Sequence, residues 1–235
     1  MFRMYYDPTM LLIIPALILS IFAQFKVKSS YSKYKELYMR NGYTGFEVAR
    51  MILDKEGLYD VPIEVINKEL GDHYDPTKRV LRLSPDVYSG RSISAAGIAA
   101  HEVGHAIQHK EHYTPLELRK AMVPISNFGS SLSIVMFILG LILGYKPLVN
   151  VGIILFSLAV LFTVVTLPVE FNASKRALKV LENSNILYED EVIGAKKVLG
   201  AAALTYVAAA LTAILQLLRL ILISRSRDLI FKFYS

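Results

Sequence analysis

The sequence contains no cysteine, and this absence excludes several kinds of site together. A chain without cysteine cannot form disulfides, cannot hold zinc through thiolates and cannot use a cysteine nucleophile. The 235-residue chain has five histidines and 20 aspartates and glutamates. Any metal site in this protein must therefore be built from imidazole and carboxylate groups.

The features of a nucleic-acid-binding protein are also missing. The chain carries a net charge of +6 and has a pI of about 9.3, but its lysines and arginines gather beside long apolar runs. No basic stripe with interleaved stacking aromatic residues stands apart from these flanks. Basic residues beside apolar runs are typical of membrane proteins. We therefore expect a lipid bilayer and no nucleic acid as a partner.

Apolar residues are abundant instead, at 54% of the chain with a mean hydropathy of +0.41. Ordinary soluble domains have roughly 45–50%. Four runs approach the length of about 20 residues that spans a bilayer core, namely residues 8–25, 122–145, 147–169 and 201–223. A short turn at Tyr145-Lys146-Pro147 separates the second and third runs, which predicts a helical hairpin across the membrane. The fourth run is rich in alanine and contains Arg219, so it either crosses, packs against the protein or lies in the interface.

The first run is expected to be an uncleaved membrane anchor and not a signal peptide. Only Arg3 precedes it as a basic residue, Asp7 opposes that charge, and Ile21 spoils a cleavage site at Ala23. Several lysines follow the run closely, so the positive-inside rule places residues 26–121 in the cytoplasm.

The predicted hairpin then returns the chain to the same side at residue 170, so the two polar segments can meet in one site. The C-terminal tail does not fit this topology. If the fourth run crosses, then Arg225, Arg227 and Lys232 lie outside, against the same rule.

The first polar segment predicts a small α+β unit. Residues 44–56 space Val48, Met51 and Ile52 along one helical face that ends at Gly57. The segments PIEVIN and RVLRLS alternate apolar and polar residues as strands do, and the turn-rich GDHYDPTK joins them. An uninterrupted helical pattern then runs through AAGIAAHEVGHAIQHK.

This last helix contains His101-Glu102-Val103-Gly104-His105, a match to the H-E-x-x-H pattern. Residues four apart project from the same face of a helix, so both imidazoles can converge on one ion. Glu102 lies on the neighbouring face, where it can take a proton from a water on the metal. We therefore predict a zinc site with Glu102 as the catalytic base.

A catalytic zinc site usually has three protein ligands and one open position, so a third donor is needed. Glu170 is the candidate, because it follows the third apolar run directly. The alternative for Glu170 is a carboxylate at a helix N-terminus, stabilised by the macrodipole. His109 and His112 compete as ligands, but a straight helix carries His109 away from an ion held by the other two. Solvated or hydrogen-bonding roles are expected for both, and His73 is expected to be a turn residue.

The motifs HEVGH, an apolar hairpin and EFNAS occur in this order, and together they resemble the membrane zinc metallopeptidases that include the HtpX heat-shock protease and the CAAX prenyl proteases. The whole chain is most similar to the YugP-type neutral zinc metallopeptidase family, through DHYDPTKRVLRLSP, AAHEVGHAIQH, LPVEFNASKRAL and AAALTYVAAAL. The resemblance covers nearly the full length and implies one zinc per chain, held by His101, His105 and Glu170, with Glu102 as the general acid/base.

One departure from the wider group concerns Ser174, which stands where those peptidases have an aspartate that orients a ligating imidazole. Asn172 or Ser174 could substitute for it. The family analogy also suggests that residues 72–84 offer an edge strand to an extended substrate. Candidates for stabilising the oxyanion are Arg176, Tyr206 and His73.

These features predict a mainly α-helical membrane protein with about four apolar helices and a small zincin-like unit of an H-E-x-x-H helix and a β-hairpin. The predicted segments are an anchor (1–25), a cytoplasmic catalytic segment (26–121), a transmembrane hairpin (122–169), a segment with the third metal ligand (170–200) and an apolar helix with a basic tail (201–235). The predicted function is zinc-dependent hydrolysis of unfolded or membrane-proximal polypeptides by a multi-pass protein of the plasma membrane. A non-enzymatic metal-binding scaffold is the alternative. A site-2-type intramembrane protease is disfavoured, because Arg91 and Lys110 bracket the motif helix and no LDG element follows.

Overall fold

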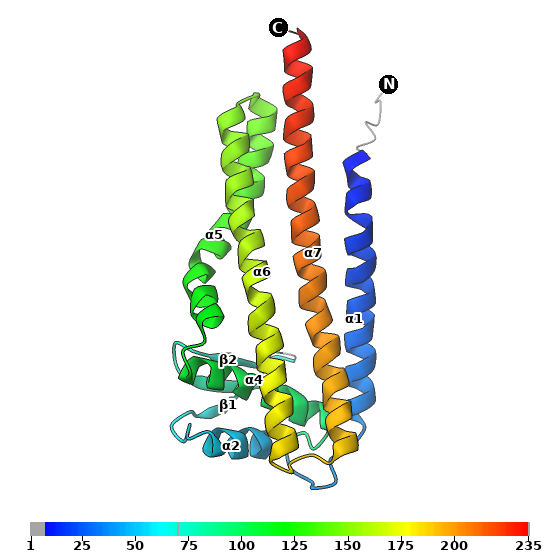
Figure 1. Ribbon diagram of the computed structural model, residues 1–235, viewed down its shortest axis with the longest axis vertical. Helices are drawn as coiled ribbons and strands as arrows, with labels where there is room; N and C mark the ends of the chain where they lie inside the picture. The colour runs from blue at the N-terminus through cyan, green and yellow to red at the C-terminus, as the bar shows by residue number, and fades with distance from the viewer. Residues whose placement is uncertain (1–7, 70, 235) are drawn as a thin grey trace. The chain divides into compact units, whose positions relative to one another are not determined.

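The computed structural model describes residues 8–69 and 71–234, with the side chains of residues 128 and 227–234 left out. Arg3, Asp7, Arg227 and Lys232 of the topology argument lie outside the described side chains. The fold is mainly helical with one small sheet, as the sequence predicts (Figure 1). In chain order the elements are η1 (Pro8–Leu12), α1 (Ile14–Lys35), α2 (Gly45–Lys55), β1 (Ile63–Val65), β2 (His73–Asp75), β3 (Val80–Leu83), α3 (Pro85–Tyr88), α4 (Ile93–Lys110), α5 (Thr114–Leu143), α6 (Lys146–Asn183) and α7 (Glu189–Tyr234).

The chain divides into two compact units that share its long helices. Unit 1 contains the chain up to Phe22, from Leu118 to Thr166 and from Tyr206 onward. Unit 2 contains Ala23–Glu117 and Leu167–Thr205. Within the described residues, four helical stretches are long and apolar enough to cross a membrane: Thr9–Lys35, Thr114–Leu143, Lys146–Asn183 and Glu189–Ser226. They agree with the four apolar runs of the sequence, and the protein is a membrane protein with several candidate transmembrane helices.

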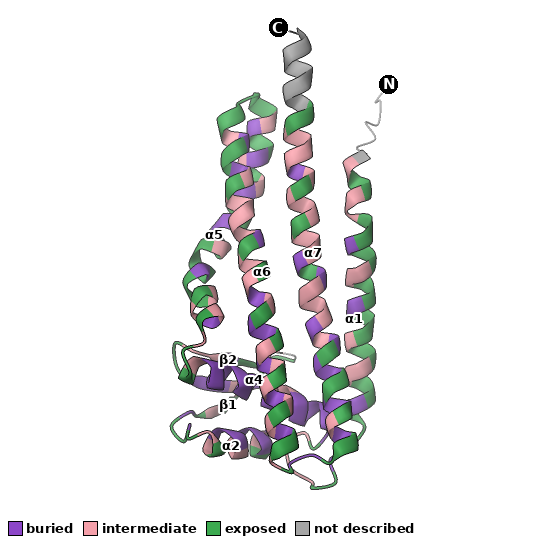
Figure 2. Ribbon diagram, viewed as in Figure 1, coloured by how far each residue is buried: buried purple, intermediate pink, exposed green. Residues whose placement is uncertain are grey.

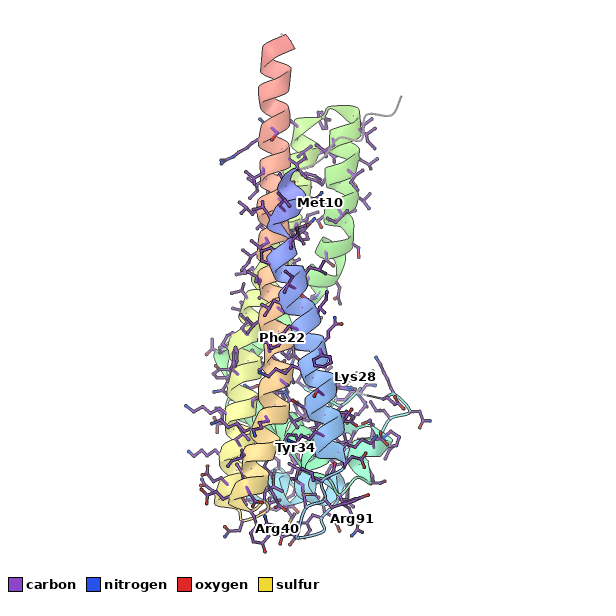
Figure 3. The ribbon with its side chains drawn as sticks, turned by 90° about the vertical axis from the view of Figure 1, so that its right-hand side faces the viewer. Met10, Phe22, Lys28, Tyr34, Arg40 and Arg91 are labelled. Carbon is purple, nitrogen blue, oxygen red and sulfur yellow. The ribbon has the colours of Figure 1, made fainter. Side chains whose placement is uncertain are left out.

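Unit 1 contains the α5–α6 hairpin, which turns at Gly144 with a φ of +64°. The two helices approach each other closely at small residues. A Cβ added to Gly140 would lie 2.6 Å from the backbone nitrogen of Val149, and one added to Gly152 would lie 2.7 Å from that of Phe137. Close helix pairs at glycine are common in membranes, where apolar burial alone does not drive association. On α1, the apolar side chains of Ile18, Ile21 and Phe22 are exposed, as expected of a helix facing lipid (Figure 3).

Unit 2 has its own core, to which α2, α4 and the sheet contribute. α2 begins with a capping box, in which the Thr44 hydroxyl accepts from the Glu47 backbone N–H and the Glu47 carboxylate accepts from the Thr44 N–H. It then buries Val48, Ile52 and Leu53 against the core. α4 begins at the N-cap Ser92 and is buried along nearly its whole length (Figure 2).

The sheet of unit 2 has three strands in the order β1-β3-β2. β1 pairs with β3 in parallel, with Ile63 opposite Leu81, and β2 pairs with β3 antiparallel, with Tyr74 opposite Leu81. The expected pairing of PIEVIN with RVLRLS as a hairpin is therefore wrong. The hairpin partner of β3 lies inside GDHYDPTK, where Asp75 accepts from the backbone N–H groups of Thr77 and Lys78 and tightens the turn. Only the second half of that segment is the turn.

Hydrogen bonds that each involve a backbone group join the loops at one end of unit 2. Met39 donates to the carbonyl of Arg91 over 2.8 Å, and the Arg91 guanidinium donates to the carbonyl of Gly42. Arg40 donates its backbone N–H to the buried Glu191 carboxylate of α7 over 2.8 Å. Figure 3 labels Arg40 and Arg91 at this end. These contacts hold the start of α4 and the start of α7 in one body.

Candidate metal centre

Three potential metal ligands, His101, His105 and Glu170, meet inside unit 2. Their donor atoms all lie within 4.8 Å of one another. Glu170 Oε2 is 3.3 Å from His101 Nε2 and 3.6 Å from His105 Nε2. Glu170 and His105 are buried, and the His101 side chain keeps only 14% of its exposure. The structure thus brings together the three residues that the sequence singled out as metal ligands.

The helical spacing of the two histidines explains half of this arrangement. His101 and His105 are four residues apart on α4, so their rings project from one face. The ring centroids are 4.8 Å apart and the planes are nearly perpendicular, at 84°. This leaves both Nε2 atoms directed at the same carboxylate oxygen of α6.

Gly104 explains the position of Glu170, because it lets α6 approach α4. A Cβ at this position would lie 2.6 Å from the carbonyl oxygen and 3.2 Å from the Cα of Ala173. Any larger residue would push the helices apart. The glycine inside HEVGH therefore brings the backbone around Glu170 within reach of the two imidazoles.

The two separations between the Glu170 oxygen and the imidazole nitrogens fit a zinc ion. Tetrahedral zinc has ligand bonds of about 2.0–2.1 Å, which puts neighbouring donor atoms about 3.3–3.4 Å apart. The separations of 3.3 Å and 3.6 Å between the carboxylate oxygen and the imidazole nitrogens are close to this value. Two imidazoles and one carboxylate are also a common donor set of catalytic zinc.

Each imidazole also has a hydrogen-bond partner for its other nitrogen, which a ligating histidine usually requires. The Ser174 hydroxyl is 3.1 Å from His101 Nδ1. The Gln108 carbonyl oxygen is 3.0 Å from His105 Nδ1. Ser174 thus contacts the imidazole that an aspartate orients in the wider group, although a hydroxyl brings no charge. Gln108 was not among the residues expected from the sequence. Its position three residues after His105 on the same helix was the available signal.

Glu102 lies beside the cluster but outside it. Its side chain is buried, and its carboxylate accepts the backbone N–H of Tyr74 in β2 over 3.1 Å. Burial raises the pKa of Glu102, although the two neighbouring imidazoles oppose this. A carboxylate with a raised pKa near the donors suits proton transfer at neutral pH. No sequence pattern pointed to the Tyr74 N–H, because the contact depends on how β2 pairs.

The charges of the site favour a cation. Burial disfavours the protonated form of His105, but the Glu170 and Glu102 carboxylates outweigh it, so the pKa of His105 is raised. A position where two buried carboxylates stabilise a positive charge also stabilises a metal ion.

The other candidates from the sequence lie elsewhere. His109 Nδ1 is 2.9 Å from the Tyr74 hydroxyl. His112 is exposed, with a φ of +51° just after α4. His73 lies in strand β2, where a turn was expected, and its Nδ1 contacts the Gly71 carbonyl. None of these three belongs to the cluster found among the described residues.

Of the proposed oxyanion groups, Arg176 donates to Asn172 and pairs with Glu111, and His73 lies near the Arg82 guanidinium. Tyr206 belongs to unit 1, whereas the cluster belongs to unit 2.

Comparisons with known proteins show which family the chain is similar to. The model of the family described as "Putative neutral zinc metallopeptidase" matches residues 9–225. The curated "Putative membrane protease YugP" of Bacillus subtilis (strain 168) is 54% identical over 212 residues, which cover 90% of this chain and 94% of that protein. No solved structure matches the chain.

Proposed function

Because the chain belongs to the family described as "Putative neutral zinc metallopeptidase", we propose that it is a membrane-anchored zinc endopeptidase in which His101, His105 and Glu170 hold one zinc ion and Glu102 is the general base. The observation that carries this proposal is the convergence of two Nε2 atoms on Glu170 Oε2, with the buried Glu102 carboxylate on the next position of the same helix.

A zinc ion at these donors supplies Lewis-acid chemistry, because it polarises a peptide carbonyl and lowers the pKa of water. The residues of the chain supply the proton transfers. A Glu102 carboxylate oxygen takes the proton of the attacking water and then gives it to the nitrogen of the departing amine. The raised pKa of Glu102 supports the first step, since it makes the carboxylate a better proton acceptor than an ordinary glutamate.

The strand β2 is the proposed docking edge for the substrate backbone. It is an outer strand, since it pairs only with β3 in the three-stranded sheet. The Tyr74 N–H of this strand reaches Glu102, so β2 runs past the catalytic base. An extended peptide added to such an edge would place its carbonyl groups beside the metal donors.

The catalytic segment is proposed to face the cytoplasm of a multi-pass plasma-membrane protein. The lysines between residues 26 and 40 support this orientation through the positive-inside rule. The proposed division is the one expected from the sequence: anchor 1–25, catalytic segment 26–121, hairpin 122–169, ligand segment 170–200 and C-terminal helix with tail 201–235. A tethered site of this kind suits unfolded or membrane-proximal polypeptides. Cleavage restricted to short soluble peptides would refute this substrate class.

The test is zinc content and cleavage measured on the same detergent-purified protein. We expect about one zinc per chain in the wild type and in Glu102→Gln, and none in Glu170→Ala. Cleavage of casein or of a membrane protein should disappear in both variants. His112→Asn is the matched control, because it removes an exposed imidazole from the end of the motif helix and should change neither readout. Wild-type protein that takes up no zinc would refute the proposal, and zinc-loaded protein that cleaves nothing would favour the metal-binding scaffold.

A further inference from the structure

We propose that Gln108, Asn172 and Arg176 are positioning residues, whose hydrogen bonds run in one fixed direction and hold His105 in the tautomer that presents Nε2 to the metal. This inference deepens the proposed function and depends on its assignment of His105 as a ligand. The contacts that carry it all lie in unit 2, between the end of α4 and the part of α6 after Leu167.

Gln108 is the central member, and its amide can point only one way. The side chain is fully buried, at 0% exposure. Its Nε2 donates to the Val169 backbone carbonyl over 2.8 Å and to Asn172 Oδ1 over 2.9 Å. If the amide were turned over, its oxygen would face these two acceptors and lose both bonds. The Gln108 oxygen is therefore fixed toward His105 Nδ1, at 3.0 Å.

Asn172 receives its direction from Arg176. Asn172 Oδ1 accepts from Arg176 Nε over 2.7 Å and from Gln108 Nε2. A guanidinium is a donor only and stays charged, so the Asn172 oxygen must face it. Arg176 is in turn held by the Glu111 carboxylate over 2.7 Å. The Arg176–Glu111 ion pair therefore fixes the orientation of the Asn172 amide, and Asn172 in turn fixes that of the Gln108 amide, whose oxygen faces His105.

The consequence falls on the His105 ring. An oxygen fixed 3.0 Å from Nδ1 can only accept, so the proton of the neutral ring must be on Nδ1. The lone pair of Nε2 is then free to bind a metal on the side of Glu170. His101 is different, because its Nδ1 faces the Ser174 hydroxyl, which can donate or accept. The two imidazoles therefore differ in their Nδ1 partners: the partner of His105 can only accept, whereas the partner of His101 can donate or accept.

The competing explanation is that Gln108 only fills space in the core. The two explanations differ for Gln108→Met, which keeps the length of the side chain and removes its hydrogen bonds. Asn172→Asp is the conservative variant, because it keeps an acceptor for both Gln108 and Arg176 and so preserves the direction of the hydrogen bonds.

The first experiment is ¹⁵N NMR of the His105 ring in metal-free, detergent-solubilised full-length protein, recorded at rising pH until the ring has lost its second proton. We expect His105 to be protonated on Nδ1 in the wild type and in Asn172→Asp, and to lose this preference in Gln108→Met. A wild-type His105 protonated on Nε2 would overturn the proposal. This measurement needs no zinc, so it separates failure of the positioning chain from failure of the proposed function.

The second experiment is zinc affinity by competition with a chelator of known affinity. Loss of a hydrogen-bond partner of a ligating histidine typically weakens metal binding about 10–100-fold, and we expect this range for Gln108→Met. Asn172→Asp should stay within about threefold of the wild type or bind more tightly, and His112→Asn is the control. A folded Gln108→Met protein that binds zinc within about threefold of the wild type would refute the proposal and favour the space-filling role. If Gln108→Met fails to fold, the wild-type ring spectrum still decides.

Discussion

Replacement of Gly104 by alanine tests whether the approach of two helices builds the metal centre. The added Cβ would lie 2.6 Å from the Ala173 carbonyl oxygen, whereas ordinary contact begins at 3.4 Å. The backbones of α4 and α6 must therefore separate by about 0.8 Å, because the contacted oxygen belongs to the backbone of Ala173 and not to a flexible side chain. The Glu170 oxygen, now 3.3 Å and 3.6 Å from the imidazole nitrogens, would move away by a similar distance.

Such a shift is large on the scale of metal coordination. Neighbouring donors of tetrahedral zinc, with bonds of about 2.0–2.1 Å, lie about 3.3–3.4 Å apart, so the shift carries the Glu170 oxygen further from this separation. We expect the zinc affinity of Gly104→Ala to fall at least about 10-fold. The overpacked core should also lose about 1–3 kcal/mol of unfolding free energy.

The assay is chelator competition for zinc, combined with thermal unfolding of the metal-free protein. Gly97→Ala is the matched control on the same helix, since its Cβ would meet the Ala195 Cβ at an ordinary 3.4 Å. The control should keep the wild-type zinc affinity and gain stability, because alanine favours a helix by up to about 1 kcal/mol over glycine. Gly104→Ala protein with wild-type zinc affinity would refute the reasoning, because it would mean that helix separation does not set the ligand distances.

Four further predictions follow from contacts in unit 2. Ser174→Ala should weaken zinc binding about 10-fold by removing the partner of His101 Nδ1, and Ser174→Asp should restore it, as chelator competition would measure. Because the pKa of His105 is raised, protons compete with the metal at a higher pH than for a free histidine, so zinc affinity should decline on acidification from above pH 6.5, the ordinary value. In the metal-free protein the same shift contributes stability below pH 6.5 that is lost as the pH rises through the folded pKa, which thermal unfolding at several pH values would detect. Thr44→Ala should cost about 1 kcal/mol by removing the cap of α2, while zinc affinity stays unchanged.

The features that could be predicted from the sequence are those that follow from the helical period of apolar residues or from a long apolar run. The apolar runs were long enough to indicate four helices, and the helical period alone placed His101 and His105 on one face. Glu170 could be proposed because it follows an apolar run directly, so that the hairpin limits where it can lie. The capped helix over residues 45–55 was also predictable, since Gly57 ends its pattern.

The features that escaped prediction depend on contacts between segments. β2 has three residues, His73–Asp75, too few to display a strand period, and it lies among turn formers. The parallel pairing of Ile63 with Leu81 is a tertiary choice that alternation cannot specify, because alternation shows a strand and not its partner. In the sequence Gln108 does not differ from other polar residues on a helix, because the acceptors of its amide lie on α6, far along the chain.

The order of the three candidate donors along the chain determines when each is made during synthesis on the ribosome. His101 and His105 precede the α5–α6 hairpin, whereas Glu170 lies on α6 itself, on the same uninterrupted helix as its apolar run. A ribosome that has made both histidines must still make α5 and the part of α6 before Glu170. A chain that ends before residue 170 therefore holds two of the three candidate donors and lacks the carboxylate that completes the cluster.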